Sequence, residues 1–494
     1  MSAAAGRRAD APPRLDAAFG ARTAEEEADL AAADSEQPAR PNPGDTHAVR
    51  EAAAAAAAGI AYQLRQLAVE PSPADRAARA EGGFGGANWD FLSNAAQMFG
   101  RPAELSEVTA ADIRRGFDMQ GYQWGGREAQ RRMYMSYRRE VYPQHQSVPH
   151  DVREVQRAAR CVEASGEFYR FRYSATGDEY RCKVGHFQLR DLLWATSSYD
   201  VFYCHADGIR CWNPWLRTRR CVLGRAEMPP AFRLSALCAD RGIVFAGDFR
   251  GRYCVRSLWA DGTAAAAGSL SAAADDSDSS IVTHASPGVL RGSAPQIVVA
   301  QNTGRVSVLD VGRLQVSSTA QFDWAVNCTA QTAGWGLACI AGDSTECLLT
   351  DPRQQQQQHR TVARLRGHRD HVFACAFSPD DRLVATGSQD TSVRVYDVRR
   401  PLEPLAAVCG HMGAMRIVRF SPCGRFLLAA EPADNVHIYD AATFDRAQDI
   451  EFMGEVAGAA FSPDAACVFV SIADAMHRDA LVEFARCSRQ GGWL

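Results

Sequence analysis

Residues 367–397 read GHRDHVFACAFSPDDRLVATGSQDTSVRVYD, and this stretch decides the fold of most of the chain. Apolar Val372, Ala374 and Ala376 alternate with the residues between them, which is typical of a strand with one buried face. A Ser-Pro-Asp-Asp turn follows at 378–381, and further apolar runs begin at Leu383 and Val393. The stretch therefore predicts three antiparallel strands joined by tight turns.

Four polar side chains interrupt these apolar runs: His368, Thr386, Asp390 and Tyr396. We expect a buried Asp390 to accept a hydrogen bond from His368, and His368 to reach Thr386 and the ring position of Tyr396. This predicted relay is structural, because it holds the turns of the strands together and brings no reactive group to the surface.

The stretch resembles a WD repeat, from its Gly367-His368 pair to its Tyr396-Asp397 pair. One repeat cannot bury both faces of its sheet, so the resemblance implies further copies at a period of about 40 residues. Phe-Ser-Pro recurs at Phe377, Phe420 and Phe461, 43 and then 41 residues apart. The resemblance implies an all-β fold: a seven-bladed WD-repeat β-propeller preceded by a disordered N-terminal tail and a short basic helix.

Weaker modules bring the expected number of blades to seven. The second copy keeps Gly410-His411 and ends at residues 437–440, but alanine at 429 and 430 and Pro432 leave its relay incomplete. Four upstream modules lie at residues 185–213, 234–256, 281–310 and 324–351. The last module has strands near 456–461, 467–472 and 481–484, and lacks an outer strand.

Residues 168–173 alternate aromatic and basic side chains just ahead of the first module. We expect this segment to supply the missing outer strand and close the ring, which removes an exposed sheet edge. The alternative is an ordinary hairpin strand packed on the side of the propeller.

Composition divides the chain of 494 residues into three parts. Residues 1–105 are rich in Ala, Pro and Gly and too poor in large apolar residues for a core, so they are predicted to be disordered. Residues 106–160 are a linker with a basic, Tyr-rich helix, and residues 161–490 form the propeller. The chain has no apolar stretch of membrane-spanning length and no secretory signal, which predicts a cytoplasmic or nuclear protein without a membrane partner.

The fifteen cysteines include no Cys-x-x-Cys pair and fall largely in predicted strands, for example at Cys204, Cys339, Cys375 and Cys467. We expect reduced, buried thiols. No metal or cofactor is expected, because His368 is used in the relay and its neighbours at 370 and 371 have no further ligand nearby.

A basic run at residues 126–142 is compatible with a helix between Gly125-Gly126 and Pro143. Basic side chains interleaved with tyrosine suit nucleic-acid binding, but they equally suit a helix packed on the propeller with its arginine head groups in solvent. A nucleic-acid partner is the less favoured of the two, because the net charge of the chain is −4. The candidate contact residues are Arg127, Arg131, Arg132, Arg138 and Arg139.

Short segments across residues 115–486 resemble a poorly characterised plant and fungal WD-repeat family whose C-terminal blades carry a label of unknown function. The resemblance implies a shared fold and an adaptor-like role, and the family offers no chemistry to carry over. These segments are FDMQGYQW (117–124), HFQLR (186–190), FDWAVN (322–327), GDSTEC (342–347), MGA (412–414) and AEPAD (430–434).

No nucleophile with a base, no acid pair and no phosphate loop has diagnostic spacing, so we expect a protein that is not an enzyme. The leading hypothesis is a protein-interaction scaffold that binds a protein or peptide. One alternative is a nucleic-acid or chromatin-associated factor that binds through residues 126–142. The other alternative is a substrate receptor of a cullin-4 ubiquitin ligase. Residues 384–399 resemble the sixteen-residue box by which some WD proteins dock the ligase adaptor, with Asp397 and Arg399 as the possible docking residues.

Overall fold

The computed structural model describes residues 105–142, 145–258, 265–270, 280–288, 295–334, 336–353, 360–473 and 478–487. All of them belong to one compact unit, Leu67–Leu494, which is the part considered below. The predicted disordered tail lies outside the described residues, apart from Leu105. The proposed boundaries of the tail, linker and propeller stay predictions.

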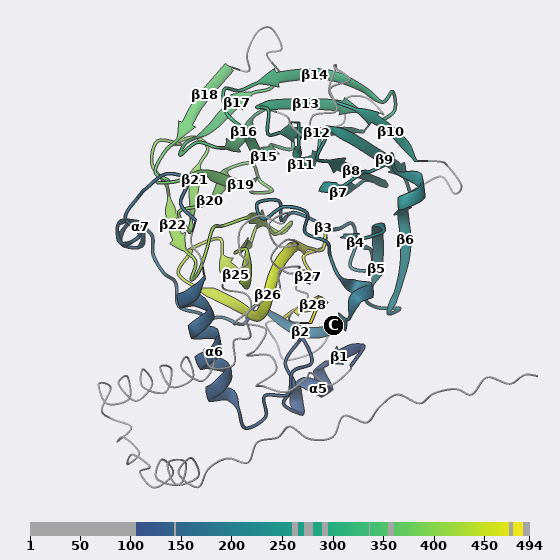
Figure 1. Ribbon diagram of the computed structural model, residues 1–494. Helices are drawn as coiled ribbons and strands as arrows, with labels where there is room; N and C mark the ends of the chain where they lie inside the picture. Colours follow the sequence, from purple (N-terminus) through teal and green to yellow (C-terminus); the bar gives the residue numbers. More distant parts are fainter. Residues whose placement is uncertain are drawn as a thin grey trace, which may run out of the picture. The chain divides into compact units, whose positions relative to one another are not determined.

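The described chain is mostly β-strand, and five of its sheets have four antiparallel strands each (Figure 1). The first contains β3 (Leu193–Ala195), β4 (Val201–His205), β5 (Gly208–Asn213) and β6 (Thr218–Gly224), and the second β7 (Leu234–Asp240), β8 (Ile243–Asp248), β9 (Arg252–Ser257) and β10 (Ala266–Ser269). The third contains β11 (Val282–Pro287), β12 (Gln296–Gln301), β13 (Arg305–Asp310) and β14 (Gln315–Gln321). The fourth contains β15 (Val326–Gln331), β16 (Ala338–Gly342), β17 (Cys347–Asp351) and β18 (Arg360–Leu365). The fifth contains β19 (Val372–Phe377), β20 (Leu383–Ser388), β21 (Ser392–Asp397) and β22 (Ala406–Cys409).

A sixth sheet has eight strands, because one long strand continues from one set of strands into the next. The sheet runs in the order β1-β2-β28-β27-β26-β25-β24-β23. The long strand β26 pairs with β25 through its first part and with β27 from Glu455 onward. The strands are β1 (Glu107–Thr109), β2 (Tyr169–Thr176), β23 (Ile417–Phe420), β24 (Phe426–Ala430), β25 (Ala433–Asp440), β26 (Ala447–Phe461), β27 (Cys467–Ala473) and β28 (Ala480–Arg486).

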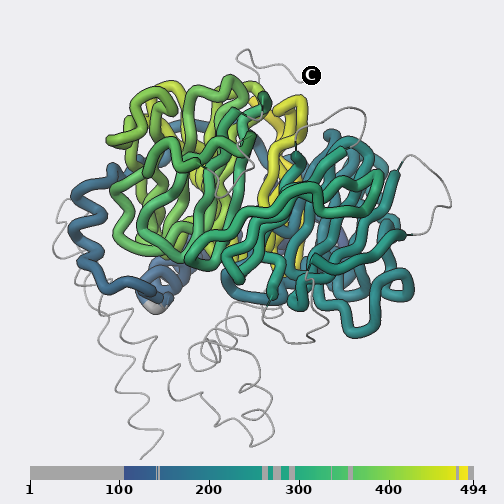
Figure 2. Tube along the Cα trace, turned by 90° about the horizontal axis from the view of Figure 1, so that it is seen from above, coloured from purple at the N-terminus to yellow at the C-terminus, as the bar shows by residue number. Residues whose placement is uncertain are grey.

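The first strands of successive sets contact one another in a closed order, β3-β7-β11-β15-β19-β23-β26, and β26 contacts β3. Figures 1 and 2 show the sheets side by side around a common centre, as in a β-propeller. The number of blades stays a prediction, and this circular order agrees with seven.

The predicted closing strand is present. Strand β2 pairs antiparallel with β28 from Tyr169 opposite Arg486 to Thr176 opposite Ala480, so a segment from before the first module completes the last one. The strand extends three residues past the predicted end at Tyr173. Strand β1 pairs with the outer edge of β2, an addition that the sequence did not predict.

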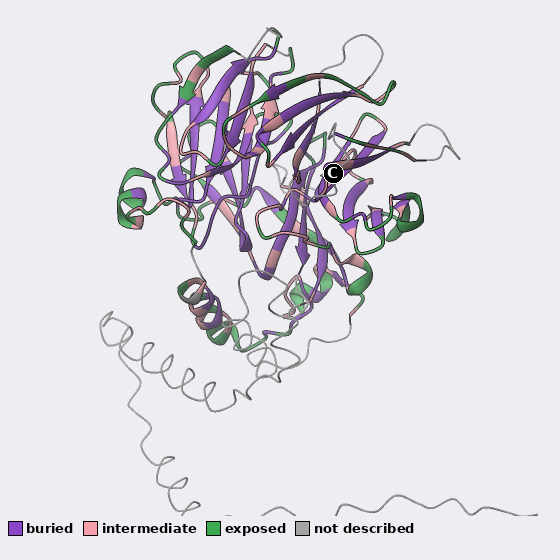
Figure 3. Ribbon diagram, turned by 45° about the horizontal axis from the view of Figure 1, so that its top comes forward, coloured by how far each residue is buried: buried purple, intermediate pink, exposed green. Residues whose placement is uncertain are grey.

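Inner strands are buried and outer strands are partly exposed, which Figure 3 shows as purple and green. Strand β27 is buried at every residue, whereas β6, β14 and β18 expose most of theirs. Trp212 of β5 is fully buried between Tyr173 of β2 and Phe469 of β27, with ring centroids 6.2 and 6.1 Å away. Burial of large aromatic rings thus joins the closing strand to the first sheet.

Helices precede the closing strand or lie in short turns of the described chain: α5 (Ala110–Arg114), α6 (Glu128–Val141), α7 (Val152–Ala158), η1 (Asp178–Tyr180) and η2 (Arg225–Glu227). Helix α6 occupies the predicted helix-compatible run. Among the described residues, no helix has the length and apolar character needed to cross a bilayer.

The prediction that all cysteines are reduced is wrong for one pair. Cys161 and Cys409 form a disulfide with an S–S distance of 2.15 Å. The segment before β2 runs parallel to β22, with Arg160 bridged to Val408, and this places together two residues 248 positions apart. The predicted cytoplasmic or nuclear location stays a prediction. The cysteines at 204, 339, 375 and 467 are free and buried, as expected.

Candidate functional site

The predicted relay around His368 forms in the sheet of β19 to β22. His368 Nδ1 lies 3.1 Å from Asp390 Oδ2, and His368 Nε2 lies 2.8 Å from Thr386 Oγ1. The Asp390 carboxylate also accepts the backbone N–H groups of Arg369 and Ser392 at 2.8 and 2.9 Å. The relay therefore ties the turn before β19 to the turn between β20 and β21.

Tyr396 takes a different part from the predicted one. Its hydroxyl donates to the carbonyl oxygen of Arg366 at 2.8 Å, so it holds the entry to the Gly367-His368 turn rather than the imidazole. The sequence analysis missed Ser392, whose hydroxyl donates to Asp390 at 2.6 Å and lies 3.2 Å from His368 Nδ1. A hydroxyl two residues after a turn aspartate is a usable signal for such a contact.

Burial opposes ionisation of Asp390, but the charge and hydrogen bond of His368 outweigh it and hold the pKa of Asp390 well below its usual range. Each polar side-chain atom of His368, Thr386, Asp390 and Ser392 has a hydrogen-bond partner among the described residues. A buried network with every member satisfied stabilises one arrangement of the turns.

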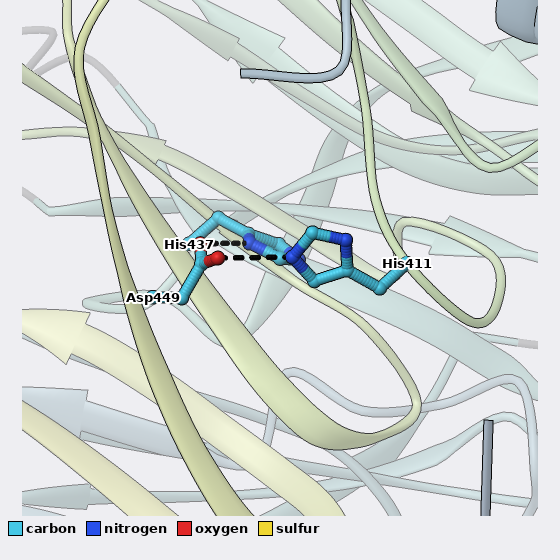
Figure 4. A group of neighbouring side chains, drawn as sticks. All are labelled: His411, His437 and Asp449. Atoms are coloured by element: carbon cyan, nitrogen blue, oxygen red, sulfur yellow. Dashed lines mark hydrogen bonds and ion pairs between the residues drawn. The ribbon is translucent and has the colours of Figure 1, made fainter. Parts of the chain in front are cut away.

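The second repeat, predicted to have an incomplete relay, contains a rebuilt network (Figure 4). His437 of β25 occupies its centre, with Nε2 2.8 Å from Glu431 Oε1 and Nδ1 2.7 Å from Asp449 Oδ1. His411, from the Gly-His pair, contacts Asp449 Oδ2 through Nε2 at 2.9 Å. Glu431 accepts the backbone N–H groups of residues 411–413 at 2.5–2.7 Å. Glu431 therefore holds the turn after Gly-His, as Asp390 does in the preceding sheet.

His411, His437 and Asp449 are close enough together to suggest a metal site, but their hydrogen bonds explain them without one. Burial disfavours a charged imidazole at His437, yet hydrogen bonds to Asp449 and Glu431 raise its pKa to about 9. A doubly protonated imidazole donates from both nitrogens and has no lone pair for a metal. We therefore interpret the cluster as a second structural relay.

Helix α6 packs on the sheet of β25 and β26 through its arginines. Arg138 forms two hydrogen bonds to Asp434, from Nε at 2.5 Å and from Nη2 at 2.7 Å, and both side chains are almost fully buried. Arg139 pairs with Glu451, and Arg131 donates to the Glu451 carbonyl oxygen at 3.2 Å. The packing alternative thus describes this helix better than nucleic-acid binding, except that the Arg138 head group is buried rather than in solvent.

The remaining arginines of this segment differ in exposure and contacts. Arg132 is exposed, and Arg127 donates its backbone N–H to Trp124. Beyond the helix, the backbone N–H groups of Ser147 and Val148 both donate to Asp370 at 3.0 Å. The segment before the closing strand therefore lies on the loops at the Gly-His end of the sheets. We call this end, with its loops 185–190, 367–371 and 410–416, the relay face.

Asp397 and Arg399 lie at the opposite end of the sheet and pair with each other. Arg399 Nε and Nη2 donate to Asp397 at 2.9 and 2.6 Å, and the arginine side chain is 67% exposed. The same arrangement recurs one sheet earlier, where Arg353 donates to Asp351 at 2.9 and 2.8 Å. The pair is therefore a repeated turn feature as well as the possible docking pair.

A cavity of about 400 Å³ lies between the first strands of the sheets, lined by β11, β15, β19, β23 and residues 188–194. Its walls combine aromatic rings, such as Phe373 and Trp194, with the charged side chains Arg190, Asp191 and Arg416. None of these residues was predicted to bind a ligand, although Arg190 lies in the HFQLR segment and Phe373 in the opening stretch. Arg416 carried no signal, because its surroundings come from loops far apart in the chain.

A family model of the WD domain, G-beta repeat, matches residues 359–397, the stretch that contains the first relay. The chain carries a WD40 repeat. Curated proteins with WD repeats are similar over part of the chain. The F-box/WD repeat-containing protein sel-10 of Caenorhabditis elegans is 35% identical over 18% of this chain and 15% of its own length.

Two further relatives each match about a third of the chain. Protein FIZZY-RELATED 2 of Arabidopsis thaliana is 24% identical over 35% of this chain and 35% of its own length. The guanine nucleotide-binding protein subunit beta-2 of Nicotiana tabacum is 25% identical over 34% of this chain and 48% of its own length. The chain thus spans less than half the length of each of these relatives, and the resemblance to a plant and fungal family stays a prediction.

Proposed function

We propose that the protein is a non-enzymatic protein-interaction scaffold whose WD-repeat propeller binds a protein or peptide at the relay face. The observation that carries this proposal is the cavity of about 400 Å³ at the centre of the sheets, with aromatic and cationic walls. Sites of this size, largely apolar with a few polar groups, are typical of ligand recognition.

The use of the buried histidines supports a non-enzymatic role. A general base needs an accessible imidazole nitrogen with a lone pair. His368 contacts Asp390 and Thr386 through its two nitrogens, and His437 contacts two carboxylates through its own. These groups are committed to holding turns.

The test is quantitative affinity capture with the full-length protein and a pair of matched variants. Phe187→Ala removes a half-exposed ring at the relay face, next to the cavity residues 188–191. Leu402→Ala removes a more exposed apolar side chain from the link between β21 and β22, at the opposite end of the sheet. We expect the first variant to lose partners and the second to retain them. Equal partner sets for both variants would contradict a partner site on the relay face.

We propose a cullin-4 substrate receptor as a second candidate, because Arg399 is exposed next to Asp397 at the end of the box-like residues 384–399. Arg399→Ala is expected to lose the ligase adaptor. Arg353→Ala is the control, since Arg353 makes the same contact with Asp351 outside the box. Loss of the adaptor in both variants, or in neither, would remove this candidate.

We also propose that the scaffold is located in the cytoplasm or the nucleus. Alkylation of cysteines in intact cells, followed by mass spectrometry of residues 161 and 409, tests it. Free thiols at both positions would support a reducing compartment, and a complete disulfide would oppose it.

A further inference from the structure

Arg416 is a buried cation with an incomplete set of partners. Its side chain lines the central cavity, and the residue is only 6% exposed. Nη2 donates to Gln389 Oε1 at 2.7 Å, whereas Nε and Nη1 have no hydrogen-bond partner among the described residues. Burying a guanidinium with unsatisfied N–H groups is costly, so such an arrangement calls for a functional explanation.

The other arginines of the cavity have carboxylate partners. Arg419 Nη2 lies 2.6 Å from Asp191 Oδ1, and Arg190 Nη1 lies 3.0 Å from Glu455 Oε2. In the described part of the chain, Arg416 forms no ion pair with an Asp or Glu within 4.0 Å. Of these three cavity arginines, Arg416 is therefore the one without a counter-ion.

Two carboxylates whose charges act on Arg416, those of Asp370 and Asp343, are engaged with other groups. Asp370 accepts the backbone N–H groups of Ser147 and Val148 at 3.0 Å, and Asp343 accepts the Asn327 side-chain amide at 2.9 Å. The buried Asp370 cannot turn toward the guanidinium without leaving its two backbone donors unsatisfied.

The guanidinium is held in a fixed position. Its central carbon lies 3.8 Å from the centroid of the Phe373 ring and 6.0 Å from that of Phe187. Gln389, which accepts from Arg416, donates in turn to the carbonyl oxygen of His145 at 2.7 Å. Stacking and this hydrogen-bond chain keep the planar guanidinium in place, with its remaining N–H groups fixed in direction.

Other cations lie near Arg416, of which Arg190 is paired with Glu455. Burial and the charges of Arg416, Arg190 and Arg233 lower the pKa of His186, which places three cations around this neutral imidazole. Arginine remains protonated at neutral pH even where burial lowers its pKa, as it does for Arg416. An anionic group entering the cavity is attracted by this field.

We infer that Arg416 binds the oxyanion of an acidic peptide segment, a carboxylate or a phosphate, inserted into the cavity beside Phe187 and Phe373. This inference rests on the proposed function, because it names the partner chemistry for the relay face. One unpartnered nitrogen of the guanidinium donates to the oxyanion, and the two rings pack on the apolar part of the inserted segment.

Fluorescence anisotropy with the full-length protein tests the inference. The probes are a labelled hexaglutamate peptide, a labelled Gly-phosphoserine peptide of the same length and a labelled hexaglutamine peptide, all at one ionic strength. We expect an acidic peptide to bind at least tenfold more tightly than hexaglutamine, and Arg416→Gln to lower that affinity at least tenfold. Preference between the two acidic peptides identifies carboxylate or phosphate as the ligand.

Arg394→Gln is the matched control. Arg394 is also 6% exposed and also has an unpartnered Nε, but it does not line the cavity. The control variant should bind like the wild type, and Arg416→Lys, which keeps the charge without the fork, should bind with intermediate affinity. Three results would overturn the inference. They are an equal loss of acidic-peptide affinity in the Arg416→Gln and Arg394→Gln variants, no loss of affinity in either variant, and binding of inorganic phosphate by a protein that binds neither acidic peptide.

Failure of the inference and failure of the proposed function give different results. If Phe187→Ala loses partners in affinity capture but Arg416→Gln does not, the scaffold function stands and the oxyanion site fails. If acidic peptides depend on Arg416 but the Phe187 and Leu402 variants capture the same partners, the site stands and the proposed function fails.

Discussion

Two buried polar regions lie in neighbouring blades and differ in how completely they are partnered. Around His368, each polar side-chain atom has a partner, and the bonds run between turns of one sheet. Around Arg416, a guanidinium of similar burial leaves two nitrogens without partners and lines the central cavity. The first region holds the fold, and the second is the one that we propose as a ligand site.

The rebuilt network around His437 belongs with the first region. Glu431 replaces Asp390 as the acceptor for the turn after Gly-His, and His437 replaces His368 as the buried imidazole. Different residues thus perform the same task in adjacent blades, so a departure from the repeat pattern is not by itself a sign of function.

The largest effect is expected for Asp390→Ala. The change leaves His368 and two buried backbone N–H groups without their acceptor and should lower the free energy of unfolding by about 3–5 kcal/mol. Urea denaturation followed by tryptophan fluorescence measures it. Asp397→Ala, at an exposed ion pair of the same sheet, is the control and should cost much less, because solvent screens the pair. Similar losses in both variants would contradict a special role for the relay.

Glu431→Gln should have the next largest effect. The amide keeps one acceptor oxygen, but its NH2 group faces the donors of the other one, and it no longer balances the charge of His437, so we expect a loss of about 2–3 kcal/mol. The same denaturation experiment checks the value. If Glu431→Gln costs nothing while Asp390→Ala does, the two networks are not equivalent.

The network around His437 should respond to pH. The folded-state pKa of His437 is raised to about 9, so its stabilising effect is complete below its unfolded value near 6.5 and is lost as the pH rises through 9. Between pH 7 and pH 9 we expect a loss of about 2 kcal/mol in the free energy of unfolding. His437→Gln should remove this part of the pH dependence. A variant with the full wild-type slope would assign the loss to other groups.

The smallest effect, of opposite sign, is expected for Arg416→Met. Replacing a buried charge that lacks a counter-ion by an apolar side chain of similar length should leave stability unchanged or raise it by about 1 kcal/mol. Thermal unfolding monitored by circular dichroism detects the change. A clear loss of stability would mean that Arg416 holds the fold, as the relay does.

Local patterns in the sequence predicted the strands, the closing segment at 168–173 and most of the first relay, because these depend on alternation and on turn residues. They failed where contacts join distant segments. Arg138 meets Asp434, and Cys161 meets Cys409, across hundreds of residues. The sequence did not predict His437 as a relay member, because its role depends on Asp449 in the next strand. Arg416 is defined by its missing partners, which no spacing reveals.

The most direct test of the proposed role of Arg416 measures stability and peptide binding in one variant. Arg416→Met is compared with the wild type by thermal unfolding and by titration with the labelled acidic peptide that binds the wild type more tightly. We expect the unfolding temperature to be unchanged or higher, together with at least a tenfold loss of peptide affinity. A lower unfolding temperature with unchanged affinity would contradict it.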